Sequence, residues 1–591
     1  MILIHTGLLL MSRKLLFLTF VGAVGFLAWF IVSSGDRESP VESMSVVEDD
    51  YSNIHPNDYM GPDTCLKCHS SHHQDWLTHA HSKMNLNPGA ETVVGDFSGK
   101  RIQYGDQQVA FEHEDGDYFM SFFKNDTLSL RYRVTRTVGS RLTQMYIGLQ
   151  TFGPEEKSHH AYHIEGKLPF GYWMNRKLWT PVSYFDSAYE PESEDESTRA
   201  ELLSHSQKDV KWEVNCLYCH NTYPYQHRLY FASALGFPRE DFKFPGGMGS
   251  LAEWGALTSS KLVSLGISCE SCHYGGREHV EHGRPTRYYP TSPELKVEDL
   301  PEGEPTSHAN VVNSICAQCH CAKVTLYPNG AATWNSREAL DLKSGACQQQ
   351  VKCTDCHNPH QPGKKGGLFS DSRIVDKCTE CHQQFRDEVT LASHTHHSAD
   401  SVNCMDCHMP KIVQGLDSVL RTHQISSPSH PLMLSMGGPN ACNLCHVDQS
   451  ISWTVNQLNS RWGLSIRPDQ NWSSEYGANL ERPVGEMWLN HSRALMRLIA
   501  TAAVQKSPFS ESPIPKLLMI LKDRYAVNRM FGLFAVEELI GRSLTIDEYD
   551  PLGKRADLEK SVEKLIQQFS REQPAARTDN TDSKLGRQAV R

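Results

Sequence analysis

The pentapeptide Cys-x-x-Cys-His occurs eight times along this 591-residue chain, and it limits the possible folds more than any other feature. Two thiols three residues apart lie on one side of a helical turn, where they can add to the two vinyl groups of one porphyrin. The histidine that follows then lies beneath the ring and can bind its iron. The repeat predicts eight covalently attached c-type haems. The attachment pairs are Cys65/Cys68, Cys216/Cys219, Cys269/Cys272, Cys316/Cys319, Cys353/Cys356, Cys378/Cys381, Cys404/Cys407 and Cys442/Cys445, and the proximal ligands are His69, His220, His273, His320, His357, His382, His408 and His446.

Other uses of paired cysteines fit this pattern poorly. A four-cysteine zinc site needs no histidine after every second cysteine, iron–sulfur clusters use clustered cysteines, and a disulfide framework needs no histidine. The motifs consume sixteen of the 18 cysteines and leave Cys321 and Cys347. In an oxidising compartment these two would form a disulfide, and the alternative is two buried free thiols that pack as small hydrophobic side chains.

The N-terminus predicts an export signal. A basic pair precedes an apolar run from Leu15 to Val32, and no small-x-small cleavage site closes this run. Residues 1–32 are therefore predicted to form an uncleaved signal anchor, with Met11 as an alternative start. The basic flank would stay in the cytoplasm and place the remaining chain on the periplasmic side of the bacterial inner membrane.

The remaining chain divides into four predicted parts. Residues 33–58 are acidic and polar and predict a linker, followed by an octahaem cytochrome c domain over 59–447. Alternating residues over 100–138, split by GD, DGD and KND turns, predict a small antiparallel meander inserted in that domain. Residues 448–570 predict amphipathic helices of the HEAT type, and 571–591 a disordered tail. The predicted fold class is mainly α, with short helices wrapped around stacked haems.

Histidines outside the motifs are candidates for the sixth ligand on the opposite face of each iron. His81 follows the first motif in WLTHAHSKM, His360 lies in CHNPH, and His423 lies in RTHQISSP after the seventh motif. The HTHH cluster before that motif offers one or two ligands. Its members are His394, His396 and His397, of which the last two are the preferred candidates. Further candidates are His163, His227, His279 and His308.

Two segments carry a family resemblance. YMGPDTCLKCHSSHHQDWLTHAHSKM resembles the first haem segment of the tetrahaem cytochromes c of ammonia oxidisers, and HTHHSADSVNCMDCHMPK with RTHQISSP is similar to late haem segments of the same superfamily. That superfamily includes hydroxylamine oxidoreductase, octahaem reductases and pentahaem nitrite reductase. The resemblance covers roughly residues 60–450 and implies stacked haems with bis-histidine ligation. All eight motifs keep His where the nitrite reductases carry a catalytic Lys, and no residue is assigned the tyrosine cross-link of hydroxylamine oxidoreductase.

These observations favour an electron carrier. The first hypothesis is a membrane-tethered octahaem cytochrome that relays electrons in a respiratory chain, between redox partners such as quinol-linked proteins or soluble cytochromes. The net charge of −11, from 58 basic and 69 acidic residues, argues against a nucleic-acid partner. A homo-oligomer is left open, as is a role of the C-terminal helices in docking another protein.

The alternative is a haem-based oxidoreductase that acts on nitrite, hydroxylamine or a sulfur oxyanion. Such a site needs hydrogen-bond donors aimed at the anion beside an iron with an open face. Basic side chains near the predicted meander are candidates, and the competing interpretation is that they pair with haem propionates. They are Arg131, Arg133, Arg136, Arg176 and Lys177.

Overall fold

The structure is a computed structural model in which the chain divides into two units, residues 1–51 and 52–591. The described residues are 50–181, 210–228, 259–293, 307–361, 368–469, 472–477, 479–507 and 513–571. The predicted anchor over 1–32 and almost all of the predicted tail over 571–591 lie outside these ranges. Among the residues described, no helix is both long enough and apolar enough to cross a membrane.

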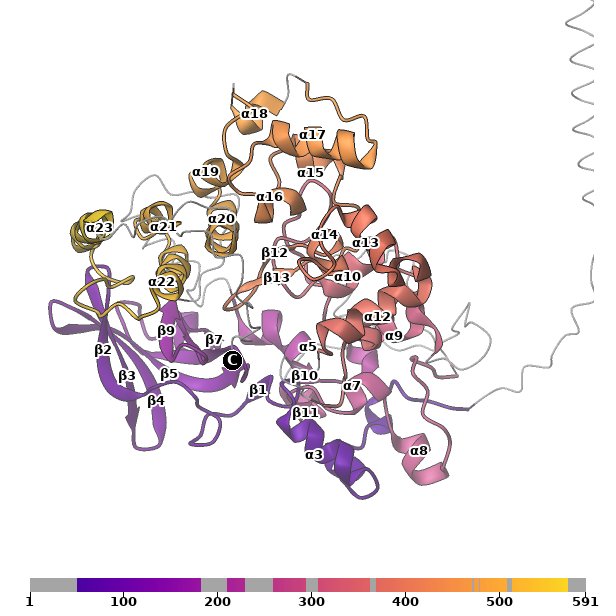
Figure 1. Cartoon of the computed structure of the whole chain (residues 1–591). Coiled ribbons are helices and arrows are strands. Elements are labelled where there is room, and N and C mark those ends of the chain that lie inside the picture. Colours follow the sequence, from indigo (N-terminus) through magenta and orange to yellow (C-terminus); the bar gives the residue numbers. More distant parts are fainter. Residues whose placement is uncertain are drawn as a thin grey trace, which may run out of the picture. The chain divides into compact units, whose positions relative to one another are not determined.

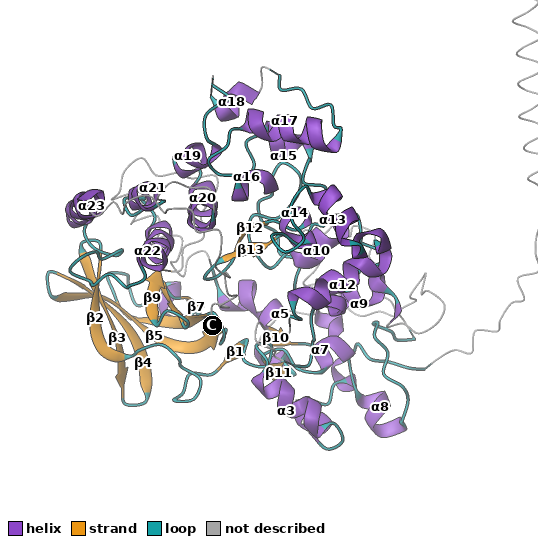
Figure 2. Cartoon of the chain, viewed as in Figure 1, coloured by secondary structure: helices purple, strands orange, loops and turns teal. Residues whose placement is uncertain are grey.

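The second unit contains a nine-stranded antiparallel sheet (Figure 2). Its main path runs in the order β2-β3-β4-β5-β6-β8-β9, with β1 paired to β5 and β7 paired to β6. The strands are β1 Asn85–Leu86, β2 Ser98–Tyr104, β3 Gln107–Glu114, β4 Asp117–Lys124, β5 Thr127–Val138, β6 Thr143–Phe152, β7 Gly166–Lys167, β8 Phe170–Trp173 and β9 Leu178–Pro181.

Two-residue turns join the first four strands of this path. Residues Asp115, Asn125 and Asp126 have positive φ angles of 50°, 49° and 60°, and Gly116 has a φ of 88°. Positive φ at both central positions matches the right-handed twist of the flanking strands, and Asn, Asp and Gly tolerate it best. The GD, DGD and KND signals therefore mark hairpin turns.

The sheet is larger than the meander predicted over 100–138. The predicted fold class, mainly α, is therefore only partly confirmed. The longest strand outside the predicted range is β6, and several consecutive residues of β6 are buried, so both of its faces are covered. A strand buried on both faces shows no apolar–polar alternation, so its sequence lacks the period of two that predicts β2 to β5.

An aromatic core fills the curled face of the sheet. The rings of Phe111 and Trp179 stack in parallel with centroids 3.6 Å apart, and the edge of Phe97 meets both Phe111 and Tyr146. Gly95 belongs to this core because a Cβ atom there would collide with the Tyr146 hydroxyl and the Trp179 ring. Such rings contribute large apolar areas and specific geometry to a core.

Helices from the C-terminal part of the chain pack on this sheet (Figure 1). The Trp173 ring on β8 contacts Phe531 and Phe534, each with centroids 5.7 Å apart. The amphipathic helices predicted over 448–570 include α21 Ile514–Ile520 and α22 Ala526–Ile540, which share one hydrophobic core with the sheet, and the HEAT assignment stays a prediction. The helices are α17 Ile451–Trp462, α18 Trp472–Tyr476, α19 Val484–Leu489, α20 Ala494–Lys506, α21 Ile514–Ile520, α22 Ala526–Ile540 and α23 Arg555–Arg571.

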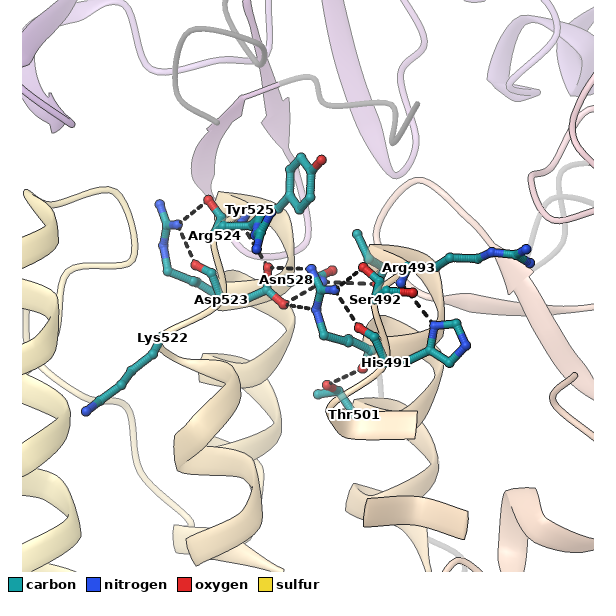
Figure 3. Close-up of polar contacts among 12 residues, drawn as sticks. His491, Ser492, Arg493, Thr501, Lys522, Asp523, Arg524, Tyr525 and Asn528 are labelled. Atoms are coloured by element: carbon teal, nitrogen blue, oxygen red, sulfur yellow. Dashed lines mark hydrogen bonds and ion pairs between the residues drawn. The ribbon is translucent and has the colours of Figure 1, made fainter. Parts of the chain in front are cut away.

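A buried polar network joins α20 to the start of α22 (Figure 3). The Arg497 guanidinium donates to the Asp523 carboxylate at 2.6 Å and to the backbone carbonyl of His491 at 2.7 Å. The Asn528 amide donates to Asp523 and to the backbone carbonyl of Ala494, both at 3.0 Å. The network satisfies polar groups that would otherwise be costly to bury.

Short helices and loops make up the rest of the unit. The further α-helices are α2 Pro62–Leu66, α3 Ser70–Thr78, α5 Leu217–His220, α7 Glu270–His273, α8 Arg277–His282, α9 Ala309–Ala317, α10 Glu338–Ser344, α11 Cys353–Cys356, α12 Asp371–Cys381, α13 Glu388–Thr395, α14 Cys404–His408, α15 Pro431–Ser435 and α16 Ala441–Cys445. Single-turn elements are η1 Pro56–Asp58, η2 His160–Tyr162, η3 Trp212–Cys216, η5 Ser259–Lys261 and η7 Gln383–Arg386. Two small hairpins pair β10 Asn221–Thr222 with β11 Ser264–Leu265 and β12 Lys411–Gln414 with β13 Val419–Arg421.

Candidate haem-binding site

Each Cys-x-x-Cys-His motif lies on or directly after a short helix. The motifs are numbered 1 to 8 in chain order, on α2, α5, α7, α9, α11, α12, α14 and α16. In motif 1 the backbone N–H of His69 donates to the carbonyl of Cys65 at 2.9 Å, and His320 and Cys316 repeat this bond in motif 4 at the same length. One closed helical turn therefore holds both thiols and the imidazole together, as attachment to a single porphyrin requires.

Five motif histidines face a second histidine across a nearly constant gap. The ring centroids of these pairs lie 6.1 to 6.4 Å apart. Two imidazoles bound to one iron have about the same separation, since each metal–nitrogen bond is about 2 Å long and each ring adds about 1 Å. The residues present thus fit haem irons with two axial histidines. The pairs are His69 with His279, His273 with His360, His357 with His423, His408 with His394, and His446 with His397.

Hydrogen bonds orient several of these rings. The Nδ1 atoms of His279, His397 and His408 lie 3.0, 2.6 and 2.9 Å from backbone carbonyl oxygens. A carbonyl only accepts, so Nδ1 carries the proton and Nε2 keeps the lone pair that can bind iron. This arrangement is typical of metal-binding histidines.

Thiol contacts connect the motifs to one another. Cysteine side chains of different motifs lie near one another and join motif 1 to 3, 2 to 4, 4 to 5 and 6 to 7. Further cysteine side chains are close enough to join motif 3 to 4, 5 to 6 and 7 to 8. The helices agree, since α9 packs on α11, α11 on α12, α12 on α14 and α14 on α16. All eight motifs therefore form one connected set.

Cys68, the second predicted attachment cysteine of motif 1, stands apart from these contacts. It is exposed, as are Cys381 and Cys445, whereas the other motif cysteines are partly buried. Its backbone N–H donates to the carbonyl of Cys65 at 3.3 Å, but within the described ranges only Cys65 of this motif has a thiol contact with another motif. The reason is local: α2 ends at Leu66, so Cys68 lies on the turn before α3, at the surface. Attachment of haem to Cys68, as to the other motif cysteines, stays a prediction of the motif.

The structure also places the other predicted distal ligands. The Nε2 atom of His396 lies 3.1 Å from the carbonyl oxygen of Arg461, and Nε2 of His163 lies 2.8 Å from that of Lys157. Neither ring is brought opposite a motif histidine. His394, the member of the HTHH cluster that the sequence does not favour, takes that position instead, with its ring within 1° of parallel to that of His408.

Two family models match the region that holds these motifs. A model described as cytochrome c552 matches residues 388–465, and one described as a doubled CXXCH motif matches residues 346–387. Multiheme cytochrome MtrA of Shewanella baltica is 26% identical over 156 residues, which are 26% of this chain and 39% of MtrA. Dissimilatory sulfite reductase MccA of Wolinella succinogenes is 21% identical over 411 residues, which are 60% of this chain and 51% of MccA.

This chain is a multihaem c-type cytochrome. The matches to MtrA and MccA span less than two thirds of either relative. Among solved structures, the outer cell wall cytochrome OcwA aligns with a TM-score of 0.37 and 14% identity, covering 86% of this cytochrome and 100% of OcwA. The octaheme sulfite reductase MccA of Wolinella succinogenes aligns with a TM-score of 0.33 and 14% identity, covering 88% and 85% of the two chains. Scores this low do not establish a shared fold.

Three motif histidines of this cytochrome have other surroundings. Within the described ranges, no imidazole ring stacks opposite His220, His320 or His382. His81 lies close enough to His320 to interact with it electrostatically. Burial, with a smaller contribution from the neighbouring His79, lowers the pKa of His81 to about 3, so its ring is neutral and able to bind a metal at physiological pH.

Buried cations that sequence reasoning missed lie beside motif 2. Arg228 is 2% exposed, donates to the carbonyl of Asn221 at 3.1 Å and contacts the Cys319 sulfur at 3.4 Å. Lys167 is 4% exposed, and burial lowers its pKa to about 7 although nearby Cys216 favours the charged form. No sequence motif marks either residue, because their proximity to motif 2 arises from packing.

The basic residues predicted near the meander have protein partners. Arg131 pairs with Glu114 at 2.6 Å, Arg133 with Asp117 at 3.6 Å and Arg136 with Glu165 at 3.1 Å, while Arg176 covers the Phe534 ring at 4.2 Å. These contacts tie three of the side chains to carboxylates on or beside the sheet. Lys177 has a positive φ of 53° at the turn between β8 and β9.

The two cysteines outside the motifs are free thiols. Cys321 interacts electrostatically with Cys319 and Cys347 with Cys381, so each lies near a motif of its own. The predicted Cys321–Cys347 disulfide is not formed, and the two thiols are partly exposed and not the buried pair of the alternative.

Proposed function

We propose that this cytochrome carries eight haems, one on each motif, and relays electrons between redox partner proteins in a respiratory chain. The opposed histidine pairs, with centroids 6.1 to 6.4 Å apart at five motifs, are the observation that carries the proposal. A bound haem supplies an iron that takes up and releases one electron. The chain is proposed to act on the periplasmic side of the inner membrane, held by the anchor predicted over 1–32.

The histidines and the contacts among motifs have separate roles in this proposal. Histidines such as His279 and His423 would hold the haem together with the motif histidines that they face, and would exclude external ligands. Backbone carbonyls accept hydrogen bonds from Nδ1–H of several of these rings. A ring held in this way would move little when the charge of a bound iron changes. The contacts among motifs place successive groups side by side.

Haem stoichiometry and charge storage test this proposal together. Intact-mass spectrometry of the holoprotein is expected to show eight covalent haems per chain, and peptide mapping is expected to find one on each motif. Film voltammetry without substrate is expected to integrate to eight electrons per chain. Fewer attached haems, or haems that exchange no electrons with the electrode, would contradict it.

A second candidate function is the reduction of a small oxyanion, and one observation favours it. Two buried cationic side chains, Lys167 and Arg228, lie beside motif 2, whose His220 has no opposed imidazole among the described residues. Buried cations stabilise anions strongly when water is excluded. Reoxidation of a reduced dye on addition of sulfite, tetrathionate, nitrite or hydroxylamine would support this function, and inertness of all four would eliminate it.

A further inference from the structure

His320 in motif 4 differs from the other orientated motif and distal histidines in the partner of its second nitrogen. Its Nδ1 atom lies 2.8 Å from a carboxylate oxygen of Glu338. The corresponding nitrogens of His279, His397 and His408 meet neutral backbone carbonyls. A hydrogen bond to an ionised acceptor is roughly twice as strong as one between neutral groups.

The fold holds the Glu338 carboxylate in this position from two sides. Its other oxygen accepts a hydrogen bond from the backbone N–H of Ser336 at 2.8 Å. The next residue, Ala339, donates its backbone N–H to the carbonyl of His320 at 3.1 Å. The first turn of α10 is therefore docked on motif 4, and the carboxylate has little freedom to leave the ring.

We infer that Glu338 is a positioning residue that makes His320 a stronger electron donor than the other axial histidines and lowers the reduction potential of the haem on motif 4. The inference rests on the proposed function in one respect, namely that motif 4 carries a haem. A carboxylate that accepts a hydrogen bond from Nδ1–H raises the electron density at Nε2. This favours the ferric over the ferrous state of an iron bound there. The negative charge itself acts in the same direction.

Motif 4 lies next to several other motifs, so a low reduction potential there would affect electron transfer through the whole set. Motif 4 adjoins three other motifs. The Cys219 sulfur of motif 2 lies 3.9 Å from the carbonyl oxygen of Cys319, the Gln318 amide donates to the carbonyl of Ser271 in motif 3 at 3.3 Å, and α9 packs on α11, which carries motif 5. It is therefore a branch point of the connected set. A low potential at a branch point raises the barrier for electrons that pass between the two ends and favours one-electron oxidation there.

Glu338→Gln tests the inference, because the amide keeps the size of the side chain and removes its charge. The expected result is an upward shift of one midpoint in a spectroelectrochemical titration, by about tenfold in the ferric-to-ferrous equilibrium or about 59 mV. Glu338→Asp, which keeps the charge but shortens the side chain, is expected to give a smaller upward shift. Glu559→Gln is the charge-matched control: Glu559 lies on α23, outside the motifs, and accepts from Arg555 at 3.2 Å, so all midpoints should stay unchanged.

Peptide mapping separates the two ways in which this experiment can fail. If the wild-type peptide that contains Cys316 and Cys319 carries no haem, the proposed function fails for this motif. If the haem is attached and Glu338→Gln moves no midpoint, or moves the midpoints no more than Glu559→Gln does, the inference about Glu338 is overturned. Should Glu338→Gln fail to load the haem, an unchanged titration of Glu338→Asp overturns it equally.

Discussion

His394 and His396 lie two residues apart in the chain, yet their rings have different surroundings. The His394 ring faces that of His408 across 6.2 Å in nearly parallel planes. His396 has a positive φ of 54°, ends α13, and turns its ring onto Trp462 and the carbonyl of Arg461. A left-handed residue at the helix end redirects the chain, and the two imidazoles therefore point to different neighbours.

Replacing His394 or His396 by alanine is expected to change the number of low-spin haems in only one of the two variants. His394→Ala is expected to remove the distal ligand at motif 7 and convert one low-spin haem to a high-spin haem, without loss of covalent haem. His396→Ala is expected to leave the number of low-spin haems unchanged, because its ring bonds to a backbone carbonyl. Quantitative EPR of both oxidised variants checks this. The same high-spin signal in both, or in neither, would contradict the pairing.

Proximal ligands are predictable from sequence, whereas distal ligands are not. The two thiols and His69 must share one helical turn, so their spacing is fixed locally and can be recognised in the sequence. The partner of His69 is His279, which comes from α8 far along the chain, and no local pattern distinguishes it from His163. Two members of the HTHH cluster, His394 and His397, face motif histidines, and the cap conformation at His396 decides which members do so.

At the scale of elements, a buried network joins α20 to the turn before α22 (Figure 3). The Asp523 side chain is 2% exposed and that of its partner Arg497 is 12% exposed. Asp523 also accepts from Asn528 and from the backbone N–H of Tyr525 at 2.9 Å. One carboxylate therefore balances a buried cation and fixes the turn before α22.

Replacing Asp523 is expected to lower the free energy of unfolding. Asp523→Ala leaves the buried Arg497 without its counter-charge, and the expected loss is about 3–5 kcal/mol of unfolding free energy. Glu548→Ala breaks the more exposed pair with Arg542, which lies at 2.8 Å, and is expected to leave the urea midpoint nearly unchanged because solvent screens that pair. Urea denaturation followed by far-UV circular dichroism compares the two variants. Equal losses would show that the network does not hold the helices.

The sheet shows which elements could be predicted. Hairpin signals and alternation locate β2 to β5 because one face of each strand meets solvent and the turns need Gly, Asn or Asp. Strands β8 and β9 are four residues each and are buried almost throughout, so they have no period to detect. The pairing of β8 with β6 and the cover of β8 and β9 by α22 arise from long-range packing that the chain order does not reveal.

At the scale of the whole molecule, the motifs form one series with a side branch. Contacts run from motif 1 through motifs 3, 4, 5, 6 and 7 to motif 8, and motif 2 joins at motif 4. A connected series with distal histidines at five motifs is what a relay requires. Motif 2, with the buried side chains of Lys167 and Arg228 beside it, is the site of the second candidate function.

The measurement that tests this account most directly is spin-quantified, low-temperature EPR of the fully oxidised holoprotein. The opposed histidine pairs predict that low-spin ferric signals, with any spin-coupled low-spin haems resolved by magnetic circular dichroism, account for at least five haems per chain. A protein in which high-spin haems form the majority would contradict the bis-histidine relay.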